Sequence, residues 1–140
     1  MKKTLLIASF LISALTVLTS CQKNLTETFQ QRILGRWYIV GASSLNPMDD
    51  WTTQKIDGKT EGTYIEFESS GIVTQTEKGA VSTVGVYSID KRVVYITWTT
   101  INDESMSKYE GLKMAFQIDY LEDDAFVLTT PGVQSLSYIR

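Results

Sequence analysis

The sequence predicts an all-β domain, a small eight-stranded antiparallel up-and-down β-barrel that follows a short helical turn. Three observations predict it. From Gly35 onward, apolar and polar residues alternate in short runs, turn residues separate the runs, and all but two connections have hairpin length. Strands joined by hairpins are usually neighbours in a sheet, so sequence order should be sheet order. Closing such a sheet removes the exposed edges that an open sheet would leave.

The eight expected strands follow one another closely. Their connections are short turns except for two long loops, residues 44–61 and 100–111. Pro131-Gly132 is typical of a type II turn, because Pro presets φ at the first central residue and Gly supplies positive φ at the second. A two-sheet sandwich is the alternative, but its crossovers need more long connections than these two. The strands are expected at residues 37–43, 63–68, 72–77, 81–89, 92–99, 112–121, 125–130 and 134–140.

Alternation along each strand assigns one apolar face to the barrel interior. Side chains at positions i and i+2 share a face, so Leu112, Met114, Phe116, Ile118 and Tyr120 should lie on one side of their strand. An eight-stranded barrel is just wide enough inside for its own side chains or for one small ligand. The interior is therefore either filled or keeps an apolar pocket. The aromatic side chains expected inside are Trp37, Phe67, Tyr87, Trp98, Phe116, Tyr120, Phe126 and Tyr138.

A different pattern precedes the strands. Lys2 and Lys3 lead into an apolar stretch, residues 5–18, that is shorter than the roughly 20 residues of a membrane-spanning helix. The stretch ends on small residues followed by Cys21, and this arrangement resembles the lipobox of bacterial lipoproteins. The resemblance implies that Cys21 is acylated, for example with palmitate, and holds the protein on a membrane. An ordinary secretory signal is the alternative, but Cys21 is the only Cys and has no disulfide partner within the chain.

The resemblance also implies a location and a domain organisation. Gln22 stands where an acidic residue would retain a lipoprotein at the inner membrane, which favours the outer membrane of the cell envelope. Leu25, Phe29 and Ile33 recur at every fourth position, as on one side of a short helix. The expected segments are a cleaved signal peptide at residues 1–20, a lipidated tether with a short helix at 21–32, and the barrel domain at 33–140.

Composition excludes several classes of function. The chain has no His and a single Cys, so it lacks the residues for a Ser-His-Asp or Cys-His nucleophile, for a His or Cys zinc site, and for a His-ligated haem. A formal net charge of −3 and the absence of a basic run argue against nucleic acid as a partner. We therefore expect no enzyme activity, no cofactor and no metal. The paired carboxylates, such as Asp49-Asp50, are expected to solvate turns.

Gly35-Arg36-Trp37, at the start of the first strand, resembles the G-x-W motif of the lipocalin superfamily. A long loop follows that strand, eight strands are expected, and the last of them carries Arg140. The resemblance implies a barrel in which this basic residue packs across Trp37 in a cation–π contact. Asp119-Tyr120 matches part of the second lipocalin motif. Over residues 33–140 the chain also looks like the lipocalin-like domains of Gram-negative lipoproteins, although it lacks the disulfide and C-terminal helix of a typical lipocalin.

The lipocalin resemblance implies a binding module for a small apolar ligand, with the narrow end closed by Trp37 and Arg140. Met48 and Trp51, in the first long loop, are expected to act as a lid over the other end. The alternative is a filled barrel that acts through its loops, as an inhibitor or as a subunit of an envelope complex. The candidate ligand-binding residues are Trp37, Phe67, Tyr87, Trp98, Phe116 and Tyr120.

Overall fold

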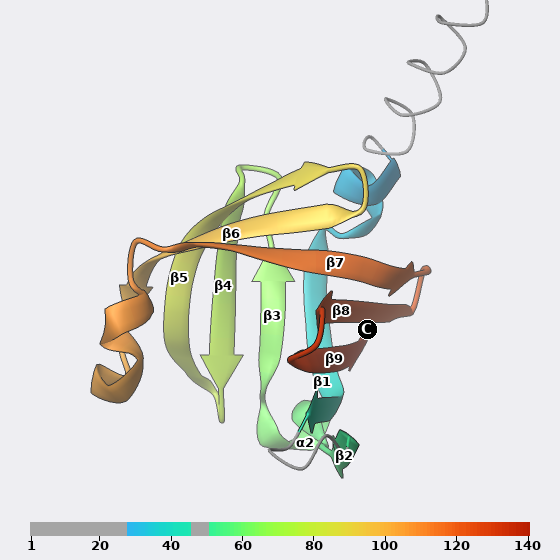
Figure 1. Ribbon diagram of the computed structural model, residues 1–140, viewed down its shortest axis with the longest axis horizontal. Coiled ribbons are helices and arrows are strands. Elements are labelled where there is room, and N and C mark those ends of the chain that lie inside the picture. Colours follow the sequence, from blue (N-terminus) through green and yellow to red (C-terminus); the bar gives the residue numbers. More distant parts are fainter. Residues whose placement is uncertain (1–27, 46–50) are drawn as a thin grey trace, which may run out of the picture.

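The computed structural model describes residues 28–45 and 51–140 and confirms the predicted eight-stranded antiparallel barrel. Eight strands follow one another around the barrel, and the pairing of β1 with β9 closes it (Figure 1). A further strand, β2, pairs with the outer part of β1. The strands are β1 Gly35–Leu45, β2 Trp51–Lys55, β3 Tyr64–Phe67, β4 Ile72–Glu77, β5 Ala80–Asp90, β6 Val93–Ile101, β7 Lys113–Leu121, β8 Ala125–Thr130 and β9 Gln134–Ile139.

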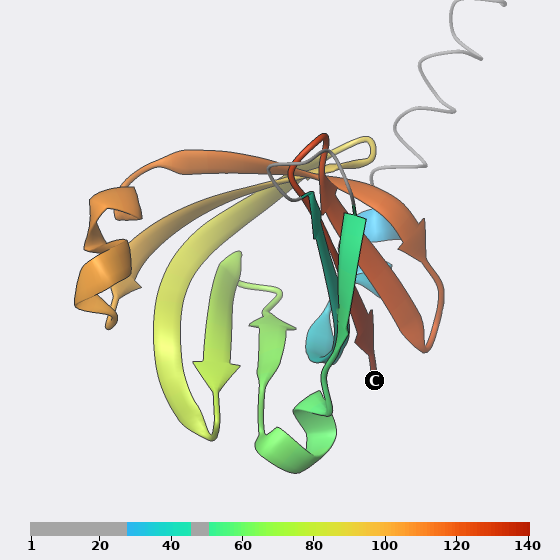
Figure 2. The ribbon, with the colours of Figure 1, turned by 60° about the horizontal axis from the view of Figure 1, so that its bottom comes forward.

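Strand β1 holds the barrel together because it is long enough for three partners. Its first part, from Gly35 to Tyr38, pairs with β3, and its last part, from Gly41 to Leu45, pairs with β2. Its opposite edge pairs with β9. The register slips by one residue between Ile39 and Gly41, a bulge that bends the strand where its partner changes. The sheet therefore curls round on itself, as Figure 2 shows.

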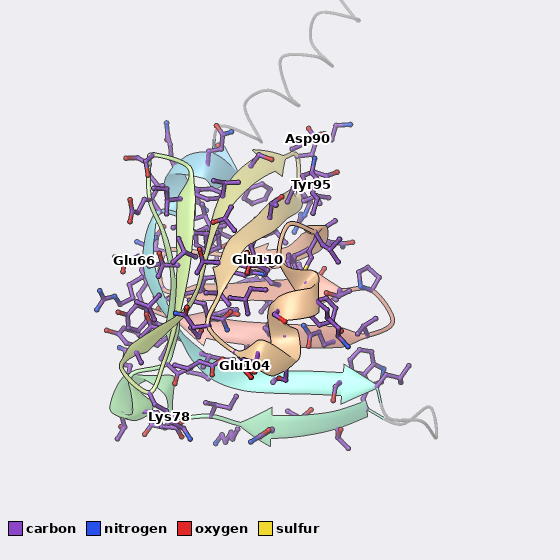
Figure 3. All side chains as sticks on the ribbon, turned by 90° about the vertical axis from the view of Figure 1, so that its left-hand side faces the viewer. Glu66, Lys78, Asp90, Tyr95, Glu104 and Glu110 are labelled. Carbon is purple, nitrogen blue, oxygen red and sulfur yellow. The ribbon has the colours of Figure 1, made fainter. Side chains whose placement is uncertain are left out.

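The two ends of the barrel differ in what covers them. The helix end carries the helical turn at residues 28–32 and the β3–β4, β5–β6 and β7–β8 connections. The loop end carries α2 (Gly58–Glu61), the 3₁₀ helix η1 (Glu104–Tyr109), and the β4–β5 and β8–β9 turns. Asp90 marks the helix end in Figure 3 and Lys78 marks the loop end.

Both long connections contain secondary structure that the sequence did not predict. Residues 44–61 were expected to be a loop, yet β1 continues to Leu45, and β2 and α2 follow. Every residue of β2 is exposed, so it has no apolar face that alternation could reveal. Asp57 begins α2 by accepting a hydrogen bond from the Thr60 backbone N–H at 3.2 Å. The second connection, 100–111, contains η1, which Asp103 caps in the same way.

The expected orientation of Tyr120 was wrong. Leu112, expected on the inner face, precedes β7 and is 52% exposed. The alternation is as predicted from Met114 to the fully buried Ile118, but the register with β8 then slips around Asp119. This bulge turns the following side chains over, because one extra residue reverses the alternation. Leu121 therefore enters the core, while Tyr120 lies on the outer face with 47% of its surface exposed.

Candidate ligand-binding site

The helix half of the barrel is filled by aromatic side chains. Trp37 and Phe126 are both 0% exposed, and their ring centroids lie 5.2 Å apart. Phe126 also packs against Tyr138 at 5.6 Å and against Phe67 at 6.2 Å. Phe67 meets Tyr87 edge-on at 5.0 Å. Distances of 4.5 to 7 Å are typical of favourable aromatic contacts, so this cluster occupies the space that a ligand would need.

Arg140 and the helical turn close this end. The Arg140 guanidinium carbon lies 4.2 Å from the Trp37 ring centroid, and its Nη2 donates hydrogen bonds to the carbonyl oxygens of Arg32 and Leu34, at 2.6 and 2.9 Å. Trp37 Nε1 donates to the Ile33 carbonyl oxygen at 2.7 Å. One cation and one indole thus satisfy three carbonyl groups where the helical turn ends, a place that leaves backbone acceptors without helical partners.

A second cation, Arg92, contacts the same helical turn. Arg92 lies 5.6 Å from the Phe29 ring centroid, and its side chain donates hydrogen bonds to the carbonyl oxygens of Ile118 and Asp119. Phe29 and Ile33, both buried, face down into the barrel. Apolar side chains and two cations therefore close the helix end against water.

The loop half presents apolar side chains that water still reaches. Ile39, Ile101, Met114 and Leu136 pack against the core but are only partly buried. Their register partners face inward: Met114 pairs with Ile96, which is 1% exposed, and Leu136 pairs with Leu128. Residues paired directly across two strands share a face of the sheet. These four side chains consequently form an apolar inner wall that is open to solvent, and we call them the loop-end wall.

Trp98 lies between this wall and the core, and Gly85 positions it. The two residues are paired in register, and a Cβ atom on Gly85 would lie 2.5 Å from the Thr97 carbonyl oxygen and 3.0 Å from the Trp98 side chain. The glycine therefore lets the Trp98 side chain approach β5 closely. Trp98 is 9% exposed, against 0% for Trp37. The sequence signals this contact only through a glycine inside a strand, a position that often marks close approach of a neighbouring group.

Uncharged polar side chains accompany the loop-end wall. Gln75 pairs with Ile65 of the core, and Thr83 pairs with both Gln75 and Ile101, so all of them face inward. Thr83 Oγ1 donates a hydrogen bond to Gln75 Oε1 at 3.4 Å. Gln134 follows the same alternation as Leu136 on β9. These polar residues were not predicted as part of the site, although the alternation of Val73 with Gln75 was a usable signal.

No family model and no curated protein matches this sequence. Three solved structures match its fold. A lipocalin-like protein from Bacteroides uniformis superposes with a TM-score of 0.58 and 19% identity, over 78% of this chain and 99% of that one. The fold is lipocalin-like. An uncharacterized protein from Bacteroides eggerthii superposes with a TM-score of 0.56 and 15% identity, over 77% of this chain and 99% of that one. A DUF4847 family protein from Bacteroides vulgatus superposes with a TM-score of 0.51 and 16% identity, over 80% of this chain and 96% of that one.

Within this lipocalin-like barrel, the predicted ligand-binding residues fall into three groups. Trp37 and Phe67 belong to the filled helix half, while Tyr120 lies outside. Tyr87 is half-buried in the helix half, where it packs against Phe67. Its hydroxyl donates a hydrogen bond to the Glu68 carbonyl oxygen at 2.8 Å, and burial raises the pKa of Tyr87. Trp98 borders the loop-end wall, and Phe116 lies one alternation inward from Met114.

The expected lid is only partly within the described residues. Trp51 begins β2, pairs with Leu45 and is 51% exposed, whereas Met48 lies outside the described residues, as does Cys21. Among residues 28–45 and 51–140, no helix is long and apolar enough to cross a membrane. No group of three potential metal-ligating side chains occurs in that same part of the chain.

Proposed function

We propose that this protein is a non-catalytic, membrane-anchored lipocalin-like lipoprotein whose barrel binds a small apolar molecule through its loop end. One observation carries the proposal: the inward side chains of the loop-end wall are partly exposed, whereas Trp37, Phe67 and Phe126 of the helix half are at most 1% exposed. Exposed apolar surface gains about 25 cal/mol for each Å² that a ligand covers. Apolar walls with a few convergent polar groups are typical of small-molecule sites.

A titration with N-phenyl-1-naphthylamine, an uncharged fluorescent probe excited directly, tests the binding. The protein for this test carries Cys21→Ser and lacks residues 1–20, and so keeps every described residue. Saturable fluorescence enhancement at one site per chain is expected. Probe emission that rises linearly, as in solvent, contradicts the proposal.

Two matched variants locate the site. Met114→Trp places an indole on the inner wall, and Ala115→Trp places one on the next residue, which is exposed on the outer face. We expect Met114→Trp to weaken probe binding at least tenfold and Ala115→Trp to leave it unchanged. Equal effects of the two variants place the probe elsewhere and contradict the proposal.

The membrane anchor is proposed from the sequence alone, through the lipobox-like residues that end at Cys21. Two or three acyl chains hold a protein on a bilayer, whereas a single chain binds only marginally. Expression of the full chain in a Gram-negative host with an alkyne-tagged palmitate should label the protein and place it in the outer-membrane fraction. Cys21→Ser should remove both label and membrane association; a labelled Cys21→Ser protein contradicts the anchor.

A second candidate function is supported by one exposed surface. Trp51 and Val133 are 51% and 56% exposed, and Leu45 links them by pairing with Trp51 and donating its backbone N–H to the Val133 carbonyl oxygen at 3.1 Å. Exposed apolar patches mark interaction sites. If an envelope protein docks here, a cross-linker on Trp51→Cys should capture it specifically, and the added change Val133→Ser should abolish capture.

A further inference from the structure

The inner face at the loop end carries hydrogen-bonding side chains, and among the described strand residues its one charged member is Glu77, which is acidic and exposed at the end of β4. Gln75, Thr83 and Gln134 lie on the inner face by register. The Thr83 hydroxyl donates a hydrogen bond to the Gln75 carboxamide oxygen. The carboxamide nitrogen of Gln75 therefore points away from Thr83. That nitrogen carries two donor hydrogens, and a ligand oxygen is the partner that it can take.

The charged side chains of the described strands lie on the outer face or at strand ends. Lys113 lies over the Tyr95 ring at 4.5 Å, and Arg36 pairs with Glu66 at 3.1 Å; Glu66 and Tyr95 are on the outside in Figure 3. Glu77 follows the alternation of Gln75, but it is exposed at the last residue of β4. The other charged residues of the described strands are Lys55, Asp90 and Asp119.

This distribution of charged side chains disfavours a charged head group on the ligand. A carboxylate or sulfate drawn into the loop end would lose water and meet no cation on the wall, and burying an unpaired charge is costly. Glu77, exposed at the last residue of β4, would repel it further. A hydroxyl, ester or amide group loses less on leaving water, and the carboxamides can replace its hydrogen bonds.

We propose that the loop end selects neutral amphiphiles, molecules with an apolar tail and an uncharged oxygen-bearing head, over their anionic counterparts. The inference rests on the proposed function and adds the ligand class. The tail lies against the loop-end wall and Trp98, and the head lies among Gln75, Thr83 and Gln134.

Displacement of bound N-phenyl-1-naphthylamine by 1-dodecanol and by dodecanoate, which differ only in the head group, tests this selection. At about pH 8, where the carboxylate is ionised, dodecanol should displace the probe at a concentration at least tenfold below that of dodecanoate. A smaller preference, or a preference for dodecanoate, overturns the selection while leaving the proposed function in place. A protein that binds neither amphiphile nor the probe overturns both.

Two variants test whether the missing cation is the cause. Gln75→Lys adds a cation on the inner face, and Thr74→Lys adds one on the adjacent, outward residue that pairs with Glu66. Gln75→Lys should improve dodecanoate displacement at least tenfold, and Thr74→Lys should leave the ratio unchanged. If Gln75→Lys does not fold, Gln134→Lys provides the same test. A folded inner-face lysine variant with an unaltered ratio overturns the assignment of the head-group site.

Discussion

The two halves of the barrel are built from the same alternation but end in different environments. In the helix half, Trp37 and Phe67 both pack against Phe126 in tilted or edge-on contacts, and a helical turn covers them. In the loop half, Met114 and Leu136 point to the same interior yet stay partly exposed. The difference arises from what closes each end and not from the strands. At the helix end, Arg140 holds the helical turn in place by two hydrogen bonds, whereas the loop-end wall meets solvent. Stability is thus concentrated in one half and accessibility in the other.

Removing an aromatic ring from the filled half should have the largest effect. Trp37→Ala should lower the free energy of unfolding by about 3 to 5 kcal/mol, because it leaves a cavity in a closed core and unpairs the Ile33 carbonyl oxygen. Chemical denaturation monitored by circular dichroism measures it. Trp51→Ala, at a half-exposed position, is the control and should change stability by less than about 0.5 kcal/mol. Comparable losses in the two variants would mean that the helix half is not the stabilising one.

A methyl group added at Gly85 should cost less and act on the loop half. Gly85→Ala should lower stability by about 1 to 3 kcal/mol, since the new Cβ would collide with backbone and force Trp98 to move. Gly41→Ala is the matched control, because its Cβ would meet its nearest neighbour at an ordinary 3.6 Å. Urea unfolding gives the stability, and probe titration of the folded variants follows the displaced indole. A Gly85→Ala protein as stable as Gly41→Ala would show that Trp98 does not pack as described.

Removing the Arg140 contacts that hold the helical turn on the barrel should have a smaller effect on stability. Arg140→Ala should lower stability by about 1 to 2 kcal/mol, through the loss of the cation–π contact and of two charge-assisted hydrogen bonds. Arg140→Lys keeps the charge but lacks the planar fork, so its loss should be intermediate. Thermal unfolding ranks the three proteins. A lysine variant weaker than the alanine variant would contradict the contacts assigned to the guanidinium.

The smallest expected effect concerns α2 at the loop end. Hydrogen bonds from the Thr60 hydroxyl and backbone N–H lower the pKa of Asp57. A carboxyl whose pKa is lower in the folded state stabilises that state above its unfolded pKa, near 3.9, and this contribution disappears as the pH falls through the folded pKa. Asp57→Asn should therefore reduce the acid-induced drop in urea midpoint measured between about pH 6 and pH 2. An unchanged fall in the urea midpoint would show that Asp57 does not contribute to the pH dependence of stability.

The sequence predicted most where alternation runs without interruption. The strands at 72–77 and 125–130 have the predicted bounds, because each alternates cleanly between two turns. Tyr120 was misplaced since a single bulge at Asp119 reverses the alternation, and whether a bulge forms depends on the register with β8. Strand β2 was missed because pairing with β1, and not burial, holds it in place.

The site was harder to predict than the fold. Trp37 and Arg140 were placed together by family resemblance, since the two residues are 103 positions apart and only the closed barrel brings them into contact. The exposure of Met114 and Leu136 was not predictable, because alternation gives the face of a side chain and not the cover above it. Gln75 and Gln134 were overlooked because they are polar residues on an otherwise apolar face.

Nuclear magnetic resonance of the three tryptophan indole N–H groups tests the division of the barrel most directly. Trp→Phe variants assign the signals, and 1-dodecanol is titrated into the otherwise unchanged protein. The account predicts that the Trp98 signal shifts to saturation, while the Trp37 signal, held by its hydrogen bond to Ile33, stays in place. A Trp37 signal that moves while Trp98 stays fixed, or two signals that never move, would contradict an accessible loop half and a closed helix half.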